Sequence, residues 1–356
     1  MLSSIEEKRK PIHLKSKLRK RNPKMVKGRK WILKQHFSGE PKIDDFELVE
    51  EELPELKNGE IMFRSLYISV DPYQKPFSAS NPVPSTMIGS SVAVVEKSKH
   101  KGFPEGAGIV LYAGWVERGI VNPDEKLSFL GGTWKYPKIK GLSPSMMLGA
   151  CGMPGLTAYF GLLRVCEPKS GETVVVSGAA GAVGSMVGQI AKIKGAKTIG
   201  FTGSDEKVKT LKDIGFDYAF NYKKISVEDA LKESAPQGVD CYFDNVGGDM
   251  STSVLQNMAQ GGRVSVCGAI STYNGGKPSK CVDLLPLFLF TELKIEGFVV
   301  GRWEKEHEAG LRELARWINE GKLKAEETVV EGFENTPQAF LGLFDGSNTG
   351  KMVVKV

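Results

Sequence analysis

A glycine-rich segment carries the clearest chemical signal in the chain. Residues 174–184 read VVVSGAAGAVG, so Gly178, Gly181 and Gly184 follow a short run of β-branched residues. In a dinucleotide-binding turn, glycines permit the tight bend, the close approach of the backbone to the pyrophosphate, and the packing of the next helix on the sheet. The N-terminus of that helix faces the phosphates with its partial positive charge. Between an apolar run and an amphipathic segment, the pattern indicates dinucleotide binding, although a plain packing turn would use the same residues.

The end of the next apolar run indicates which dinucleotide is bound. An NAD site usually places Asp or Glu there, about 20 residues past the turn, to hold the ribose 2′-hydroxyl. Here the run ends in Gly203 and Ser204, and the two acidic residues that follow are expected to enter a helix. Lys207 can meet a 2′-phosphate as a point charge, and Tyr222 closes the following strand. NADP(H) is therefore favoured, with a solvated helix lysine as the alternative interpretation of Lys207.

The segments around the glycine turn alternate between strand and helix character. Apolar strands that alternate with helices indicate a parallel sheet covered on both faces, which is an α/β fold. We expect strands at 173–177, 198–202, 219–221, 239–244 and 263–267, and helices at 157–166, 186–194, 207–214, 227–233 and 251–258.

The chain before residue 150 has a different pattern of residues. Runs rich in β-branched and aromatic residues, separated by Pro, Gly and Asn, predict a β-rich domain with few helices. The later part predicts one long helix, ended by Gly321, and two C-terminal strands that most simply rejoin the β-rich domain. These strands are expected at 31–38, 46–53, 60–70, 87–96, 326–333 and 351–356, and the long helix at 304–320. The predicted domains are 25–150 with 322–356, and 151–321.

Charge and cysteine content exclude several classes of protein. The first 24 residues hold nine Lys/Arg and two Glu, a net charge of +7, so the rest of this 356-residue chain carries −1. We expect this tail to be a disordered arm, although 15–21 fits a loose nuclear-localisation pattern and Met25 could be an older start. With a net charge of −1, the chain after residue 24 is not expected to bind nucleic acid. The longest apolar run, 284–290, is far shorter than the ~20 residues of a membrane span.

Five scattered cysteines without a C-x-x-C pair, and only four histidines, predict neither a disulfide framework nor a zinc site. A reducing compartment, the cytoplasm, is the expected location. Histidines at 36, 100 and 307 stand near no cysteine in a ligand-like pattern, so no bound metal is expected.

Seven ordered segments recur together in one protein family. They are VDPY (70–73), MPGLTAY (153–159), AAGAVG (179–184), GSDEK (203–207), DNVGG (244–248), CGAISTY (267–273) and EGFEN (331–335). Over about residues 25–356 the chain resembles the zinc-independent medium-chain dehydrogenases/reductases that reduce alkenals and alkenones. The resemblance implies a Rossmann dinucleotide-binding domain inserted in a GroES-like β-rich catalytic domain, NADPH/NADP+ as cofactor, and a homodimer.

The resemblance also implies site residues. The pyrophosphate would be held by Gly181, Ala182, Val183 and Gly184, and the 2′-phosphate end by Lys207 and Tyr222. The rest of the cofactor would be lined by Asn245, Cys267, Gly268, Ala269, Ile270, Ser271, Thr272, Tyr273, Phe298, Val299, Val300, Gly301, Arg302, Trp303 and Asn348. Tyr273 would be the catalytic residue, and Tyr73 a substrate-binding residue.

The implied activity is NADPH-dependent reduction of the C=C bond of α,β-unsaturated aldehydes and ketones, including 15-oxoprostaglandin-type enones. Oxidation of the 12-hydroxyl of leukotriene B4 with NADP+ is a possible second activity. A tyrosine hydroxyl suits enone reduction because it is protonated at neutral pH and can donate to the developing enolate oxygen. Quinone reduction and non-catalytic NADPH binding remain the alternatives. Tyr73 and Tyr273 could also be packing residues, and Cys267 is expected to be a buried, unreactive thiol.

Three positions depart from the family pattern. Gln74-Lys75 replaces the usual Met-Arg pair, Gly301 stands where many relatives have tyrosine, and the loop 274–285 lacks a proline run. We expect hydride chemistry to survive these changes and substrate preference to be affected.

Overall fold

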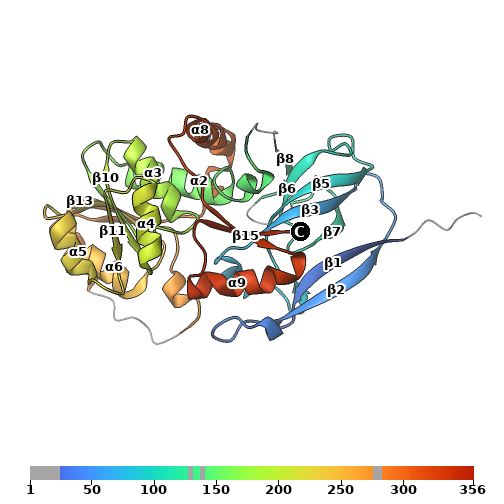
Figure 1. Ribbon diagram of the computed structural model, residues 1–356, viewed down its shortest axis with the longest axis horizontal. Helices are drawn as coiled ribbons and strands as arrows, with labels where there is room; N and C mark the ends of the chain where they lie inside the picture. Colours follow the sequence, from blue (N-terminus) through green and yellow to red (C-terminus); the bar gives the residue numbers. More distant parts are fainter. Residues whose placement is uncertain (1–24, 127–130, 137–140, 276–282) are drawn as a thin grey trace, which may run out of the picture.

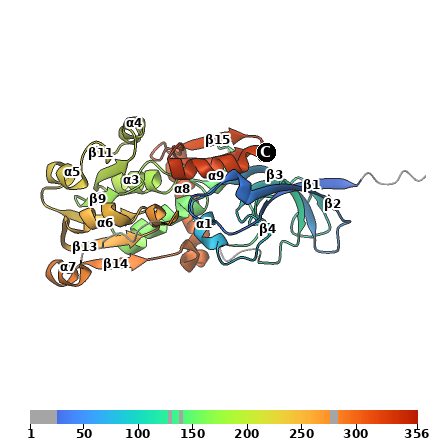
Figure 2. The ribbon, with the colours of Figure 1, turned by 90° about the horizontal axis from the view of Figure 1, so that it is seen from below.

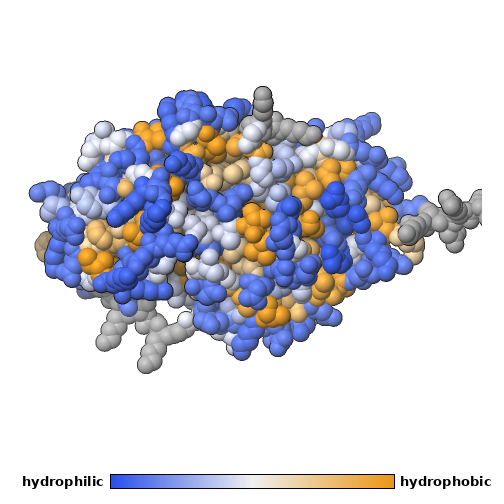
Figure 3. Space-filling view, in the orientation of Figure 1, coloured by the Kyte–Doolittle hydropathy of each residue, from blue (hydrophilic) through white to orange (hydrophobic). Residues whose placement is uncertain are grey.

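The computed structural model describes residues 25–126, 131–136, 141–275 and 283–356, and forms two lobes along its longest axis (Figure 1). One lobe is built on a parallel sheet and the other on antiparallel strands, with α9 (Thr336–Asp345) and the C-terminal strands between them. On the face shown in Figure 3, hydrophilic residues predominate and apolar residues form separate patches. The basic tail predicted for 1–24 lies outside the described residues.

The parallel sheet has six strands in the order β11-β10-β9-β12-β13-β14, and each neighbouring pair is parallel. Figure 2 shows the sheet from β11 to β14, with α7 beside β14. The strands are β9 (Thr173–Val176), β10 (Lys197–Thr202), β11 (Tyr218–Asn221), β12 (Val239–Asp244), β13 (Met258–Val266) and β14 (Lys294–Gly297). The connecting helices are α3 (Gly184–Ile193), α4 (Asp205–Asp213), α5 (Val227–Ser234), α6 (Gly248–Leu255) and α7 (Leu284–Thr291).

Strand β9 shows why this sheet must be covered on both sides. All four of its residues are buried, and successive side chains point to opposite faces. Val174 and Val176 pack in a cluster with Met186 of α3, whereas Val175 packs in a second cluster with Ala230 of α5. An all-apolar strand is stable only with helices on both faces, which is the predicted α/β arrangement.

The second lobe contains the front of the chain and its C-terminus. Its main sheet runs β15-β16-β3-β5-β6-β8, with β7 also paired to β3, and a smaller sheet runs β2-β1-β4. Strand β16 pairs antiparallel with β3, Val353 opposite Ser69, so the expected return of the C-terminal strands is confirmed. The strands are β1 (Val26–Leu33), β2 (Phe46–Leu53), β3 (Ile61–Ser69), β4 (Ser85–Thr86), β5 (Ser91–Ser98), β6 (Gly108–Leu111), β7 (Arg118–Val121), β8 (Trp134–Lys135), β15 (Glu327–Glu331) and β16 (Lys351–Lys355).

The predicted fold class is confirmed, and several element boundaries were wrong. Strand β1 begins at Val26 instead of residue 31. The helix expected over 157–166 is α2 (Met153–Phe160) followed by a π-helical turn to Cys166. The helix expected over 304–320 is a 3-10 segment (Val300–Glu306) and α8 (His307–Asn319), because Trp303 has non-helical dihedral angles. Helix α6 begins at Gly248, three residues early. The domain boundaries remain a prediction.

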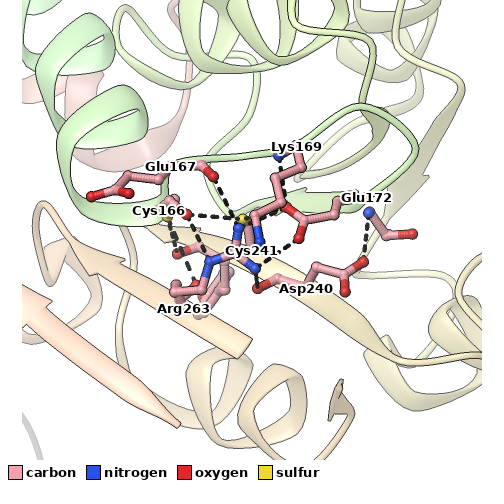
Figure 4. A network of polar contacts seen from close by, with 9 residues as sticks. Cys166, Glu167, Lys169, Glu172, Asp240, Cys241 and Arg263 are labelled. Atoms are coloured by element: carbon pink, nitrogen blue, oxygen red, sulfur yellow. Dashed lines mark hydrogen bonds and ion pairs between the residues drawn. The ribbon is translucent and has the colours of Figure 1, made fainter. Parts of the chain in front are cut away.

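A polar network fastens the sheet at the edge where β9 begins (Figure 4). Arg263 pairs with Glu172, with Nη2 2.6 Å from Oε2, and donates from Nε to the carbonyl of Cys166 at 2.8 Å. Hydrogen bonding with Cys166, and then burial, raise the pKa of the Cys241 thiol. Both cysteines are fully buried, so we assign them to packing.

Among the described residues, no helix is long and apolar enough to cross a lipid bilayer.

Candidate active site

The turn after β9 needs glycine at two positions, one for its backbone dihedral angle and one for the close approach of α3 to the turn. Gly178 has a φ of +58°, which favours glycine. A Cβ on Gly184 would lie 2.4 Å from the carbonyl oxygen of Gly178, so a larger residue would push α3 away from the turn. No side chain caps the N-terminus of α3 at Val183, although exposed helix termini usually gain such a partner. The turn is therefore shaped for an anion at the helix N-terminus.

A second turn, after β12, meets the glycine turn at the centre of the sheet. From β9 the chain continues to one side of the sheet and from β12 to the other, which makes this the point where strand order reverses and ligands bind. Asn245 donates from Nδ2 to the carbonyl of Ser177 at 2.8 Å, and its own N–H donates to Ser177 Oγ at 2.9 Å. The predicted residues Asn245 and 181–184 thus lie on two turns joined through Ser177.

Asp244 organises this second turn, and the sequence prediction missed it. Its buried Oδ1 accepts hydrogen bonds from the hydroxyls of Ser177 and Tyr242, both at 2.9 Å, and from the N–H groups of Val246 and Gly247 at 2.9 and 3.0 Å. The two N–H groups stand at the start of α6, so the carboxylate also complements the helix dipole. The signal was present: an aspartate at a buried strand end before Gly-Gly.

The segment after β13 folds back over the second turn and presents Tyr273. The N–H groups of Cys267 and Gly268 donate to the carbonyl of Asp244 at 2.9 and 3.1 Å. A short 3-10 turn, Ile270–Thr272, then brings the Tyr273 hydroxyl back, where it accepts from the Ala269 N–H at 3.3 Å. The hydroxyl lies 3.2 Å from the position of a Cβ on Gly268, so a larger residue there would press on the phenol.

Electrostatics keep the Tyr273 hydroxyl protonated. Burial raises its pKa above the usual value of 10, against the opposing hydrogen bond from Ala269. Since the oxygen accepts from the backbone, its proton is available for a further acceptor. Burial also raises the pKa of Cys267 to about 12, with nearby Asp244 adding to the effect. Cys267, which was expected to be buried, is partly exposed, and its thiol is neutral at physiological pH.

The end of β10 is followed by Gly203 and Ser204 in place of an acidic residue. Ser204 caps α4, its Oγ accepting from the Lys207 N–H at 3.3 Å, and the Tyr222 hydroxyl lies 3.2 Å from the position of a Cβ on Gly203. Asp205 begins α4, as expected, and is ion-paired with Lys224. Burial lowers the pKa of Lys207, whose Nζ donates to the Gly346 carbonyl at 2.7 Å.

The C-terminal segment joins the two lobes at the glycine turn. The Gly350 N–H donates to the carbonyl of Ala180 at 2.8 Å, and Gly350 forms an isolated parallel bridge with Gly181. Asn348 donates from Nδ2 to the Gly350 carbonyl at 3.0 Å. Asn348 is therefore held beside the glycine turn although 164 residues separate it from Gly184.

The segment 298–303 follows the last strand of the sheet. Phe298 packs against Phe243, and Trp303 stacks on Phe160 with ring centroids 5.4 Å apart. Arg302 pairs with Glu296 at 2.5 Å. These side chains are engaged with protein groups, so cofactor contacts of this segment would come from Val299, Val300 and Gly301. Half of the Val299 side chain is exposed.

Tyr73 stands at the start of α1 (Gln74–Ser78) in the β-rich lobe. Burial raises its pKa well above the usual value, and the nearby charge of Asp71 adds to this effect. Tyr112, which the sequence analysis did not single out, has its pKa raised by the same two causes. Asp71 itself is buried in an ion pair with Lys351, with 3.0 Å between Oδ1 and Nζ. Both phenols are therefore neutral hydrogen-bonding groups.

In the part of the chain that the structure describes, no three His, Cys, Asp or Glu side chains gather closely enough to hold a metal ion. The expectation that catalysis needs no metal stays a prediction.

Comparison with known proteins places this site in a family. A family model described as "Zinc-binding dehydrogenase" matches residues 182–316, and one described as "N-terminal domain of oxidoreductase" matches 29–128. Prostaglandin reductase 1 of Bos taurus is 50% identical over 93% of this chain and 100% of its own length. The NADPH-dependent curcumin reductase of Escherichia coli is 35% identical over 93% of this chain and 97% of its own.

A solved structure agrees with the sequence relatives. The crystal structure of CurA in complex with NADPH from Vibrio vulnificus superposes with a TM-score of 0.85, at 35% identity, and covers 92% of this chain and 99% of that one. Together with the two-lobed fold and the turns around Gly181 and Asn245, these matches show that the chain belongs to the family of medium-chain dehydrogenases/reductases that includes prostaglandin reductase 1.

Proposed function

We propose that this protein is an NADPH-dependent oxidoreductase that reduces the C=C bond of α,β-unsaturated aldehydes and ketones. The observation that carries the proposal is a protonated, backbone-anchored Tyr273 hydroxyl beside the turn where strand order reverses. That position is where a dinucleotide lies in open parallel sheets, so a hydrogen-bond donor stands where a substrate would meet the cofactor.

The residues present fit the cofactor. The pyrophosphate would lie on the glycine turn at the uncapped N-terminus of α3, where a side chain at Gly184 would not fit. The 2′-phosphate would be bound by Ser204, Lys207 and Tyr222, and the carboxylate at the first residue of α4 that could bind a ribose hydroxyl instead, Asp205, is paired with Lys224. The curcumin reductase relative is named as NADPH-dependent, and the CurA structure contains NADPH.

Bound NADPH would supply the hydride that adds to the β-carbon of the enone. Negative charge then develops on the carbonyl oxygen, and the Tyr273 O–H is placed to donate a hydrogen bond to it. Donors fixed before reaction cost no reorganisation, and here the Ala269 N–H and the Gly268 position fix the phenol oxygen. The proton for the α-carbon would come from solvent. Tyr73 and Tyr112, kept neutral by burial, are available to line the substrate side.

Substrate class is inferred from the relatives. The protein would accept 2-alkenals and 15-oxoprostaglandin-type enones, since the relatives of 46–50% identity are named prostaglandin reductase 1. The test is NADPH consumption by the purified chain with a long-chain 2-alkenal, a 15-oxoprostaglandin and a quinone, NADH being the control donor. A saturated carbonyl product supports the proposal. Turnover of the quinone alone, or NADPH binding without any turnover, would contradict it.

We further propose a homodimer. Leu285, Leu289 and Phe290 of α7 are each more than 70% exposed, whereas the helix packs inward through Leu284 and Leu287. Helix α7 lies beside β14, which ends the sheet and is paired on one side only (Figure 2). An apolar helix next to an open strand edge is typical of an interface. Sedimentation should show a dimer for the wild type and a monomer for Leu289→Asp, and a monomeric wild type at micromolar concentration would refute the proposal.

We also propose a cytoplasmic location. The described cysteines are free thiols, which suits a reducing compartment. Imaging of the tagged full chain would test this, and a change of location on deletion of residues 1–24 would instead identify the tail as an address.

A further inference from the structure

Lys75 is a buried cation at the junction of the two lobes. It belongs to α1, which lies between the lobes in Figure 2, and only 6% of the residue is exposed. Its Nζ donates to the carbonyl of Gly39 and, at 2.7 Å, to Oδ1 of Asn274. The rings of Phe37 and Phe344 enclose it, with centroids 5.9 and 5.7 Å from Nζ.

The surroundings of this ammonium group offer no direct ion pair. Within the described residues, its hydrogen-bond partners are a backbone carbonyl and a side-chain amide, both uncharged. Burial lowers the pKa of Lys75, against the more distant charges of Glu40 and Asp45. An apolar side chain of similar length would fill the space without the cost of burying a charge. We therefore assign Lys75 a role in positioning the groups that it binds, Gly39 and Asn274.

The partners of Lys75 lie next to both candidate tyrosines. Tyr73 stands two residues before Lys75 and begins the same short helix. Tyr273 immediately precedes Asn274, at the end of the turn that presents its hydroxyl. The Lys75–Asn274 hydrogen bond thus joins the Tyr73 helix in one lobe to the Tyr273 turn in the other, across 199 residues of sequence.

The loop through Gly39 reaches the same ammonium group. Gly39 has a φ of +71°, and a Cβ there would lie at an ordinary van der Waals distance, 4.0 Å, from the carbonyl oxygen of Asn274. Lys75 binds both the Gly39 carbonyl and the Asn274 side chain, and so ties the two segments together. The Phe37 and Phe344 rings pack around the same amine, so three segments meet at Lys75, and Asn274 joins them from the Rossmann lobe.

We propose that Lys75 is a positioning residue for the reaction proposed above, on which this inference rests. By binding Asn274, it fixes the Tyr273 turn relative to the Tyr73 helix and so sets where the phenol donor meets the substrate oxygen. Lys75 touches neither the predicted pyrophosphate turn nor the Lys207 site, so its loss should lower kcat and leave NADPH affinity unchanged. Small displacements of a catalytic donor are costly, because alignment contributes much of a rate.

The test compares Lys75→Met, Lys75→Arg and Asn274→Ala with a matched control, Lys232→Met. Lys232 is a solvent-exposed lysine of α5, and its side chain is 73% exposed. We expect Lys75→Met and Asn274→Ala each to lower kcat for a 2-alkenal about tenfold, about 1.4 kcal/mol of activation free energy, with an unchanged Kd for NADPH. Lys75→Arg should recover most of the rate, since it retains a cationic donor. The double variant should be no slower than either single variant.

Hydrogen exchange supplies a readout that does not depend on turnover. The N–H of Ala269 bonds to Tyr273, and those of Thr272 and Tyr273 bond within the turn. These amides should exchange faster in Lys75→Met and Asn274→Ala than in the wild type or Lys232→Met.

The outcomes separate this inference from the proposed function. If the wild type reduces no enone, the proposed function fails, and faster exchange in the variants still supports the Lys75 contact. Unchanged exchange in both variants, wild-type kcat in both, or a loss confined to NADPH affinity would overturn the positioning role. Should Lys75→Met fail to fold, Asn274→Ala decides alone.

Discussion

Replacement of Tyr273 by phenylalanine separates its chemical role from its structural role. The substitution removes one oxygen and keeps the ring. The structural loss is a single hydrogen bond from the Ala269 N–H, long at 3.3 Å, so the free energy of unfolding should fall by about 1 kcal/mol or less. The chemical loss is a donor to the developing enolate oxygen, which typically supplies ~3 kcal/mol, or roughly a hundredfold in kcat.

The assay is steady-state reduction of a 2-alkenal by NADPH, together with thermal unfolding and NADPH titration of the same samples. Tyr218→Phe is the control, because Tyr218 stands at the start of β11, away from the carboxyl ends of the strands. We expect kcat of Tyr273→Phe to fall about 100-fold while the melting temperature changes little. A kcat within twofold of the wild type would refute the catalytic assignment, and so would an equal loss in the control.

The pH profile gives a second check on the same residue. The donor is the protonated phenol, and burial raises its pKa above 10. The proton is therefore bound throughout the neutral range and is lost only as pH rises through the raised pKa. The Tyr273-dependent part of kcat should be constant from pH 6 to about 9 and decline at more alkaline pH. A decline centred near pH 7 would mean that another group titrates in the rate-limiting step.

Two further predictions concern the cofactor. Lys207→Glu should lower kcat/KM for NADPH at least tenfold relative to NADH, because it places a negative charge beside the 2′-phosphate. Lys209→Glu should not, because the Lys209 side chain is 79% exposed on the same helix. Equal effects of the two variants would argue against the Lys207 assignment. Gly184→Ala should lower the melting temperature by several degrees and weaken NADPH binding, because its Cβ would lie 2.4 Å from a carbonyl oxygen. In the control Gly132→Ala the new Cβ meets nothing within 4 Å, so neither quantity should change. A wild-type melting temperature and NADPH affinity in Gly184→Ala would show that the turn relaxes freely.

Local patterns in the sequence predicted NADPH as the cofactor and the strands and turn around residues 178–184, whereas the individual cofactor contacts stay predictions. The glycine turn at 178–184 and the absence of an acid at Ser204 are both properties of short contiguous segments, and the strands beside them were apolar on both faces. Helix α4, predicted at 207–214, begins at Asp205 because Ser204 caps it, and the prediction did not use that capping signal. Helix α9 carried a comparable signal, with Pro337 in its first turn and Gly346 at its end, and the prediction passed over it.

What the sequence could not supply was contact between distant segments. Asp244 joins strands 67 residues apart through Ser177, and Lys75 meets Asn274 across 199 residues. Neither pairing leaves a periodic or spacing signal, because each depends on how the two lobes pack. The break at Trp303 has a similar origin, since its ring is drawn onto Phe160, which lies far away in sequence.

The position of β16 has a consequence for how the protein is made. This strand follows all the other described strands along the chain, yet it lies between β15 and β3 in the sheet of the front lobe. Its pairing of Val353 with Ser69 closes a loop of nearly the whole chain, and such long-range pairing forms slowly.

The Rossmann lobe can fold before residues 327–356 are made, because its strands pair with one another. Gly350, which bonds to Ala180, follows all of those strands along the chain. We therefore expect a chain without β16 to keep a folded Rossmann lobe, attached to an open, aggregation-prone sheet edge.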